Sequence, residues 1–224
     1  MGLPRPTALI LMLAMAALAA GPSAEASGPR GKAGIRASRV RNVGRVVPDD
    51  ELRKEPVPRP SGNIHVMNVN LHEELKINIF NPDGSYSVEA MEELSRLLRC
   101  KRTDEQRPME PRLFSILSTV YDHYGGRRVD VVSGFRNQRR TSSYHFKGSA
   151  TDIRVPGVSP RKLRAYVQSL DTGGMGIGIY PRTGFVHVDI RPLPSYRWID
   201  HSRSNPNSAD KRPPRGWKRK KLQS

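Results

Sequence analysis

Apolar and polar residues alternate along several short segments in the middle of the chain, the pattern of strands with one buried face. The segments that we expect to be strands are Ile64–Val69, Glu74–Phe80, Val129–Val132, Ala150–Val155, Gly176–Tyr180 and Phe185–Arg191. The last two are joined by Pro181-Arg182-Thr183-Gly184, a turn sequence that predicts a hairpin.

Three other segments carry apolar residues at the spacing of amphipathic helices. The predicted helices cover residues 88–98, 111–124 and 160–170. Ser87 can cap the first helix, and Pro111 is a favourable first residue for the second. Because helices come early and strands late, we expect an α+β fold: a single small domain with a central antiparallel sheet flanked by helices.

These elements place the folded domain at residues 63–199, with polar segments on both sides. Residues 27–62 are rich in Pro, Gly and Arg and are expected to be a basic linker. Residues 200–224 contain few apolar residues and end in a lysine and arginine run, which predicts a disordered basic tail.

Residues 1–26 resemble an export signal. Arg5 precedes an apolar run over 8–20, and Ala24-Glu25-Ala26 has the small residues of a cleavage site. The run is shorter than the ~20 apolar residues of a membrane span. We therefore expect a cleaved signal peptide and an exported protein, either periplasmic or associated with the cell wall.

The chain has a formal net charge of +17, and eleven of these charges lie in the linker and the tail. Such charge often indicates nucleic acid, but an exported protein meets little of it, and we expect no nucleic-acid partner. The basic arms would instead contact an anionic cell wall or membrane surface, or remain as solvated disorder. We expect a monomer. The single cysteine, Cys100, excludes an internal disulfide.

Two segments carry residues suited to chemistry: Ser143-Tyr144-His145-Phe146-Lys147-Gly148-Ser149-Ala150-Thr151-Asp152 and Phe185-Val186-His187-Val188-Asp189. Two imidazoles and one carboxylate are a frequent ligand set for zinc in hydrolases, where a fourth position is kept for water. Taken singly, a buried histidine is more often a hydrogen-bonded core residue than a metal ligand. Spacing alone leaves both interpretations open.

These motifs resemble the zinc D-alanyl-D-alanine peptidase group, which includes VanX-type dipeptidases and shares its fold with hedgehog signalling domains. The resemblance is greatest to YcbK-type murein endopeptidases. It rests on the S-x-H-x-x-G-x-A-x-D element that begins at Ser143, on the F-V-H-V-D element that begins at Phe185, and on Ser133-Gly134-Phe135-Arg136. It covers residues 64–198.

The resemblance implies one zinc ion per chain, held by His145, Asp152 and His187, and a substrate among peptidoglycan peptides. It implies a catalytic role for Arg136, whose guanidinium would stabilise the oxyanion of the reaction. A structural salt bridge is the other interpretation of Arg136. Ser143 is the expected substrate-binding residue.

Two features depart from the family. Gly184 stands where related dipeptidases and carboxypeptidases have a catalytic Glu, so we consider Asp189 instead. Asp189 shares a strand face with His187 and would either accept a proton from water or orient the imidazole. The basic loop before His145 is short, with eight residues over 137–144.

The function expected from the sequence is that of an exported zinc metallopeptidase that hydrolyses amide bonds in peptidoglycan stem peptides or cross-links. Two alternatives remain open at this stage. One is a zinc-containing cell-wall-binding module without catalysis, because the Glu is missing. The other is a D,D-carboxypeptidase or dipeptidase.

Overall fold

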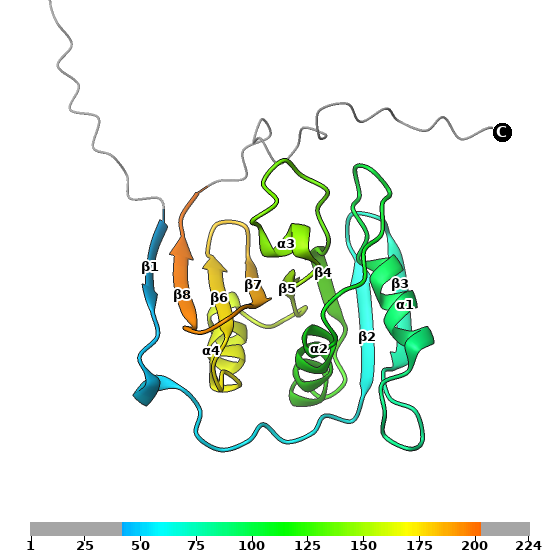
Figure 1. The fold of residues 1–224 in the computed structure, drawn as a ribbon, viewed down its shortest axis with the longest axis horizontal. Helices are drawn as coiled ribbons and strands as arrows, with labels where there is room; N and C mark the ends of the chain where they lie inside the picture. The colour runs from blue at the N-terminus through cyan, green and yellow to red at the C-terminus, as the bar shows by residue number, and fades with distance from the viewer. Residues whose placement is uncertain (1–41, 203–224) are drawn as a thin grey trace, which may run out of the picture. The chain divides into compact units, whose positions relative to one another are not determined.

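A computed structural model describes residues 42–202 of the chain. Its centre is a sheet of eight strands in the order β1-β8-β6-β7-β5-β4-β2-β3 (Figure 1). In chain order the strands are β1 (Asn42–Val46), β2 (Asn63–Asn68), β3 (Glu73–Asn78), β4 (Val129–Ser133), β5 (Ala150–Arg154), β6 (Met175–Tyr180), β7 (Phe185–Ile190) and β8 (Tyr196–Asp200). The predicted signal peptide and all but the first residues of the predicted tail lie outside the described residues.

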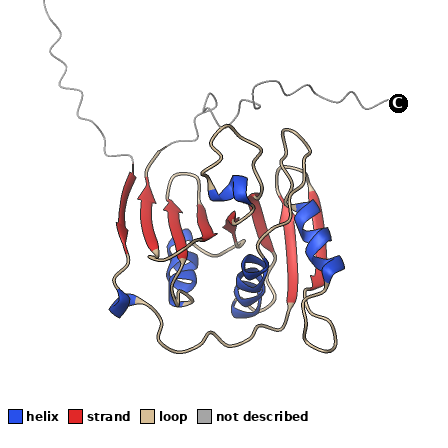
Figure 2. Ribbon diagram, in the orientation of Figure 1, coloured by secondary structure: helices blue, strands red, loops and turns tan. Residues whose placement is uncertain are grey.

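Four α-helices and one short 3-10 helix accompany the sheet (Figure 2). They are η1 (Asp49–Glu51), α1 (Val88–Leu97), α2 (Pro111–His123), α3 (Tyr144–Lys147) and α4 (Pro160–Ser169). The hydroxyl oxygen of Ser87 accepts a hydrogen bond from the amide of Ala90 and so caps α1, as Ser159 caps α4. The three predicted helices are confirmed to within a residue at each end. The short α3 was not predicted.

One face of the sheet packs against the core, and the other carries the predicted site. Val186 and Val188 of β7 point to one face, where they join Ile153 and Ile177 of neighbouring strands and the apolar side chains of α1, α2 and α4 in the core. His187 lies between these two valines in sequence and therefore points to the opposite face. The core and the predicted site thus lie on opposite faces of the sheet.

The expected antiparallel sheet is correct for five of the seven strand pairs, but β2 pairs with β4 and β6 pairs with β8 in parallel. The expected sheet was also too small, because β1 and β8 were not predicted. β8 follows Pro192 and Pro194 and has polar residues on both faces, which hides the alternation that identifies a strand.

β1 lies within the predicted linker, so that prediction is wrong for residues 42–46. All five residues of β1 are exposed, and the strand is held by its backbone pairing with β8 at the edge of the sheet. Val47, directly after it, is 2% exposed. A strand that buries no side chains leaves no hydrophobic pattern, which is why composition indicated a linker here.

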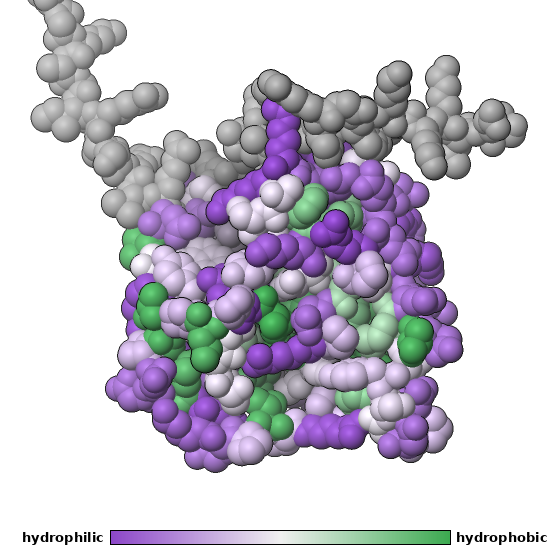
Figure 3. All heavy atoms as spheres, in the orientation of Figure 1, coloured by the Kyte–Doolittle hydropathy of each residue, from purple (hydrophilic) through white to green (hydrophobic). Residues whose placement is uncertain are grey.

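The surface seen in Figure 3 is mainly hydrophilic, with apolar residues interspersed among charged and polar ones. Among residues 42–202, no helix has the length and apolar character needed to cross a membrane.

Candidate metal centre

The site is built on one row of residues that crosses the sheet on the face opposite α1, α2 and α4. Asp152 of β5 lies directly opposite His187 of β7, and His187 lies opposite Gly178 of β6. Directly opposed residues on paired strands point to the same face, so this register sets the carboxylate beside the imidazole. The pairing of β5 with β7 thus fixes the positions of two of the three predicted ligands.

His145 comes from α3, a single turn that lies against β5 and β7. Gly148 ends this turn with φ of 76°, and a side chain there would meet the carbonyl oxygen of Pro108 at 2.5 Å. The ring nitrogen Nδ1 of His145 donates to the carbonyl oxygen of Gly134 at 2.7 Å. The imidazole is therefore held with Nε2 directed at the other two side chains.

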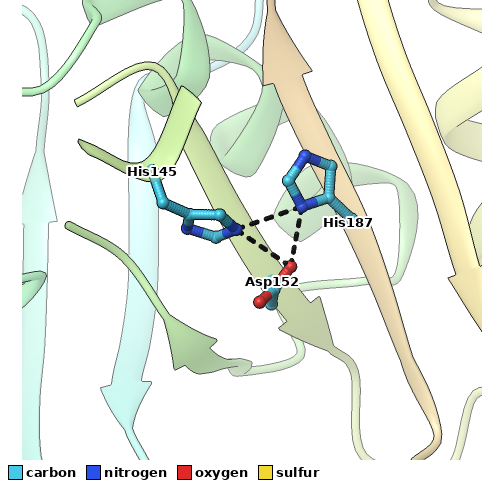
Figure 4. A group of neighbouring side chains, drawn as sticks. All are labelled: His145, Asp152 and His187. Carbon is cyan, nitrogen blue, oxygen red and sulfur yellow. Dashed lines mark hydrogen bonds and ion pairs between the residues drawn. The ribbon is translucent and has the colours of Figure 1, made fainter. Parts of the chain in front are cut away.

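His145, Asp152 and His187 come together as predicted (Figure 4). Nε2 of His145 lies 3.1 Å from Nδ1 of His187, and each nitrogen approaches Oδ1 of Asp152, at 3.4 and 2.9 Å. All three residues are buried. The two histidines and the aspartate therefore form one cluster that could hold a metal ion.

The hydrogen bonds around the cluster favour a cation at its centre. Nε2 of His187 lies 2.9 Å from Oδ2 of Asp189, so this nitrogen carries the ring proton, as Nδ1 of His145 does toward Gly134. With both imidazoles neutral, the two inner nitrogens and the carboxylate are acceptors that face one another, and Arg136 is a cation that already contacts their edge. A metal ion satisfies three converging lone pairs, and imidazole and carboxylate are ligands that zinc accepts.

The ionisation of His145 and Asp152 suits this role. Burial and the nearby Arg136 guanidinium lower the pKa of His145 to about 4, so its imidazole is neutral at physiological pH. Burial acts to raise the pKa of Asp152, but His145 and Arg136 overcome it and hold the pKa well below its usual value. Asp152 is therefore an ionised carboxylate.

Arg136 lies at the edge of the cluster. Its Nε donates to the hydroxyl of Ser133 at 2.7 Å, while Nη2 contacts the carboxylate of Asp152 and lies 2.9 Å from Nε2 of His145. Its side chain is 31% exposed, whereas that of Asp152 is 3% exposed. Arg136 thus makes the salt bridge that was one interpretation of this residue and also reaches the surface beside the cluster.

Asp189 faces away from the centre of the cluster and is saturated with donors. Its Oδ2 accepts from His187, and Nε and Nη2 of Arg191 donate to the two carboxylate oxygens at 2.7 and 2.5 Å. Burial raises the pKa of Asp189, but Arg191 and His187 overcome it and lower the pKa below its usual value. The side chain of Asp189 is 1% exposed.

Aromatic side chains surround Arg191, and a glycine on the neighbouring strand leaves space for its guanidinium. Its guanidinium carbon lies 4.8 Å from the ring centre of Tyr144 and 5.8 Å from that of Trp198. Gly176 lies below it, and a Cβ at Gly176 would be 2.1 Å from Nη2 of Arg191. The space that Arg191 and Asp189 occupy exists because β6 has glycine at this position.

The sequence of the chain matches a known protein family. The family model described as peptidoglycan L,D-endopeptidase MepK (Peptidase_M15_2) matches residues 58–196, which is more than half of the chain. The chain belongs to this family. It is therefore a peptidase, and the sequence-based resemblance to murein endopeptidases is confirmed.

Individual relatives of the chain carry the same description as the family. "Probable peptidoglycan L,D-endopeptidase MepK" of Haemophilus influenzae is 30% identical over 168 residues, 69% of this chain and 88% of that protein. "Peptidoglycan L,D-endopeptidase MepK" of Escherichia coli K12 is 32% identical over 162 residues, 66% of this chain and 86% of that protein. No solved structure matches the chain.

Two residues that surround the cluster in the structure were not predicted from the sequence as parts of the site: Arg191 and Gly176. Arg191 follows Asp189 by two residues, so both leave the same face of one extended segment, and this spacing was the available signal. Gly176 gave a weaker signal, since a glycine within an apolar strand indicates close approach of another group. Ser143 lies just before α3, and its hydroxyl does not cap that helix.

Proposed function

We propose that this chain is an exported zinc peptidase that hydrolyses amide bonds in peptidoglycan cross-links, with the L,D specificity named for its relatives. The observation that carries the proposal is the convergence of three buried side chains, His145, Asp152 and His187, beside a partly exposed arginine. Three protein ligands leave a fourth position for water, as in catalytic zinc sites, whereas a structural metal site is closed by four protein ligands.

In this proposal His145, Asp152 and His187 hold the zinc ion through Nε2, a carboxylate oxygen and Nδ1. Zinc so bound supplies an activated water molecule and polarises the carbonyl of the scissile amide. The protein contributes rigidity, because two ligands are on paired strands and the third is fixed by Gly134. A preformed cluster loses little free energy to reorganisation when substrate binds.

Arg136 binds the oxygen of the scissile carbonyl as negative charge develops on it. Its Nε is engaged by Ser133, which sets the plane of the guanidinium and directs Nη2 toward the cluster. A fixed cationic donor at this place stabilises the transition state more than the ground state. Ser143 lies at the start of α3 beside the same edge, and we assign its hydroxyl to a polar group of the substrate.

Asp189 orients His187 in this proposal and does not accept the proton of the attacking water. Both of its oxygens are already hydrogen-bonded to Arg191, and one also accepts from His187. A carboxylate that accepts from a ligand imidazole fixes its tautomer and strengthens it as a ligand. Of the two roles considered from the sequence, the geometry favours this one.

The location and partners follow from the substrate. Peptidoglycan lies outside the cytoplasmic membrane, in agreement with the export signal expected over residues 1–26. The basic arms would add salt-sensitive attraction to an anionic wall or membrane surface. We propose that the protein acts as a monomer, since the three ligands come from one chain.

The test is mass spectrometry of defined dimeric muropeptides incubated with the mature protein. We expect zinc-dependent cleavage of L,D cross-links, loss of cleavage with a chelator, and no cleavage by His187→Ala. Removal of a terminal residue alone would identify a carboxypeptidase. Saturable binding to cell walls without any new product, under several metals, would support the non-catalytic wall-binding module and refute the proposal.

A further inference from the structure

A groove lies on the helix side of the sheet, away from the metal cluster. It has a volume of about 760 Å³, and it is lined by Lys54 and the residues 56–60, by the turn that ends at Tyr86, and by one face of α2. Figure 1 shows the segment between η1 and β2 running along one end of the sheet. Met175 contributes to the groove floor and belongs to the core face. None of the lining residues belongs to the metal cluster.

The groove has a positive lining. Lys54, Arg59 and Arg112 all contribute to it, and none of its lining residues is Asp or Glu. A cleft lined by one sign of charge attracts ligands of the other sign. The volume lies in the range of sites that bind small molecules or short peptides, about 300–1,000 Å³.

The walls of the groove are already ordered. Arg59 stacks on Phe80 at 4.2 Å from the ring centre, Phe80 packs against Tyr86 at 5.2 Å, and the hydroxyl of Tyr86 lies 2.6 Å from that of Ser115 on α2. The segment that carries Arg59 also contains Pro56, Pro58 and Pro60, three residues that restrict the backbone. A groove that does not have to be ordered on binding retains more of its interaction energy.

We propose that this groove binds a carboxylate-bearing stem peptide of peptidoglycan that is not the one being cleaved. The inference rests on the proposed function for the choice of ligand. The cations match the carboxylates of such a peptide, and the rings of Phe80 and Tyr86 offer apolar contact to its side chains. Because the groove and the metal cluster lie on opposite faces, one chain can engage two strands of the polymer, which raises its effective concentration at the wall.

The test measures binding to the full mature chain that carries His187→Ala, so that no peptide is cleaved. An uncross-linked disaccharide tetrapeptide is titrated and followed by NMR, and we expect shifts in the amides of Tyr86, Ser115 and Thr119. Lys54→Gln with Arg59→Gln should weaken binding by roughly three- to tenfold. Arg161→Gln with Lys162→Gln removes the same charge from exposed positions on α4 outside the groove and should leave the affinity unchanged.

Thr119→Glu is a second variant that keeps every cation and adds a carboxylate to the lining of the groove. It should weaken binding by repulsion and serves if the double variant disturbs the turn near Gly84. Equal affinity of the groove and control variants overturns the inference. So does equal binding of the amidated peptide or of an unrelated acidic peptide.

The two proposals fail separately in this design. If the wild-type protein cleaves no muropeptide, the proposed function is wrong, while the titration still reports on the groove. If cleavage occurs and the groove amides do not respond to peptide at millimolar concentration, the groove inference alone is wrong. The rate on intact cell-wall sacculi provides an independent measurement, and it should fall for the groove variants relative to the α4 control.

Discussion

Replacing Gly176 by alanine tests the network that holds His187. The added Cβ would lie 2.1 Å from Nη2 of Arg191 and 2.3 Å from Oδ2 of Asp189, far inside van der Waals contact. Gly176 does not have a positive φ, so alanine introduces no backbone strain and the effect is steric. Arg191 and Asp189 have to move, and Asp189 then loses its position beside Nε2 of His187.

The magnitude follows from what the pair does. Removing the hydrogen-bond partner of a ligand imidazole typically costs about 10- to 100-fold in metal affinity. This corresponds to about 1.4–2.8 kcal/mol of binding free energy. Overpacking adds a loss of about 1–3 kcal/mol in the free energy of unfolding. The affinity is measured by competition with a chromophoric chelator, and the stability by thermal unfolding of the metal-free protein.

Gly184→Ala is the matched control. Gly184 has φ of 77° and nothing within 4 Å of the new Cβ, so alanine strains the turn without touching the network. It should cost stability, about 1–3 kcal/mol, and leave metal affinity near that of the wild type. Removing Arg191 as well as changing Gly176 should give non-additive effects, because both act on Asp189. Wild-type metal affinity in Gly176→Ala would refute the proposed network.

Three further predictions concern the cluster itself. Arg136→Gln should lower kcat by about 10²- to 10³-fold while metal content stays stoichiometric, and loss of metal would instead make Arg136 a structural residue. Asp152→Asn should abolish the rise in unfolding temperature that zinc produces. In the wild type, zinc at 100 times its Kd should stabilise the folded protein by about 2.7 kcal/mol. An unchanged rise in the variant would exclude Asp152 as a ligand. Burial lowers the pKa of His187, but its hydrogen bonds to Asp152 and Asp189 overcome burial and raise it. Because a proton then competes with zinc at Nδ1, metal affinity should fall by about tenfold per pH unit below that pKa. The affinity is measured by calorimetry in buffers of different ionisation enthalpy. An affinity that does not change between pH 5 and 8 would contradict this assignment.

Much of the fold could be predicted because most of its elements bury side chains. β7 alternates between the core and the cluster face, and helices α1, α2 and α4 have apolar stripes with recognisable first residues. The edge strand β1 could not be predicted, since its pairing is made by backbone groups that are the same in every sequence. The parallel pairing of β6 with β8 likewise depends on chain connectivity, and local sequence does not encode it.

The convergence of His145, Asp152 and His187 could be predicted because their spacing resembles a known motif, but the role of Asp189 could not be decided from the sequence. An Asp two residues after His187 points to the same side of β7 whether it is a base or an orienting residue. The orienting role that we propose rests on Arg191 and on the space above Gly176, which lies on another strand opposite Asp189. Both oxygens of Asp189 are taken because a glycine leaves room for a guanidinium. The absence of a side chain on β6 therefore determines the chemistry available to a carboxylate on β7.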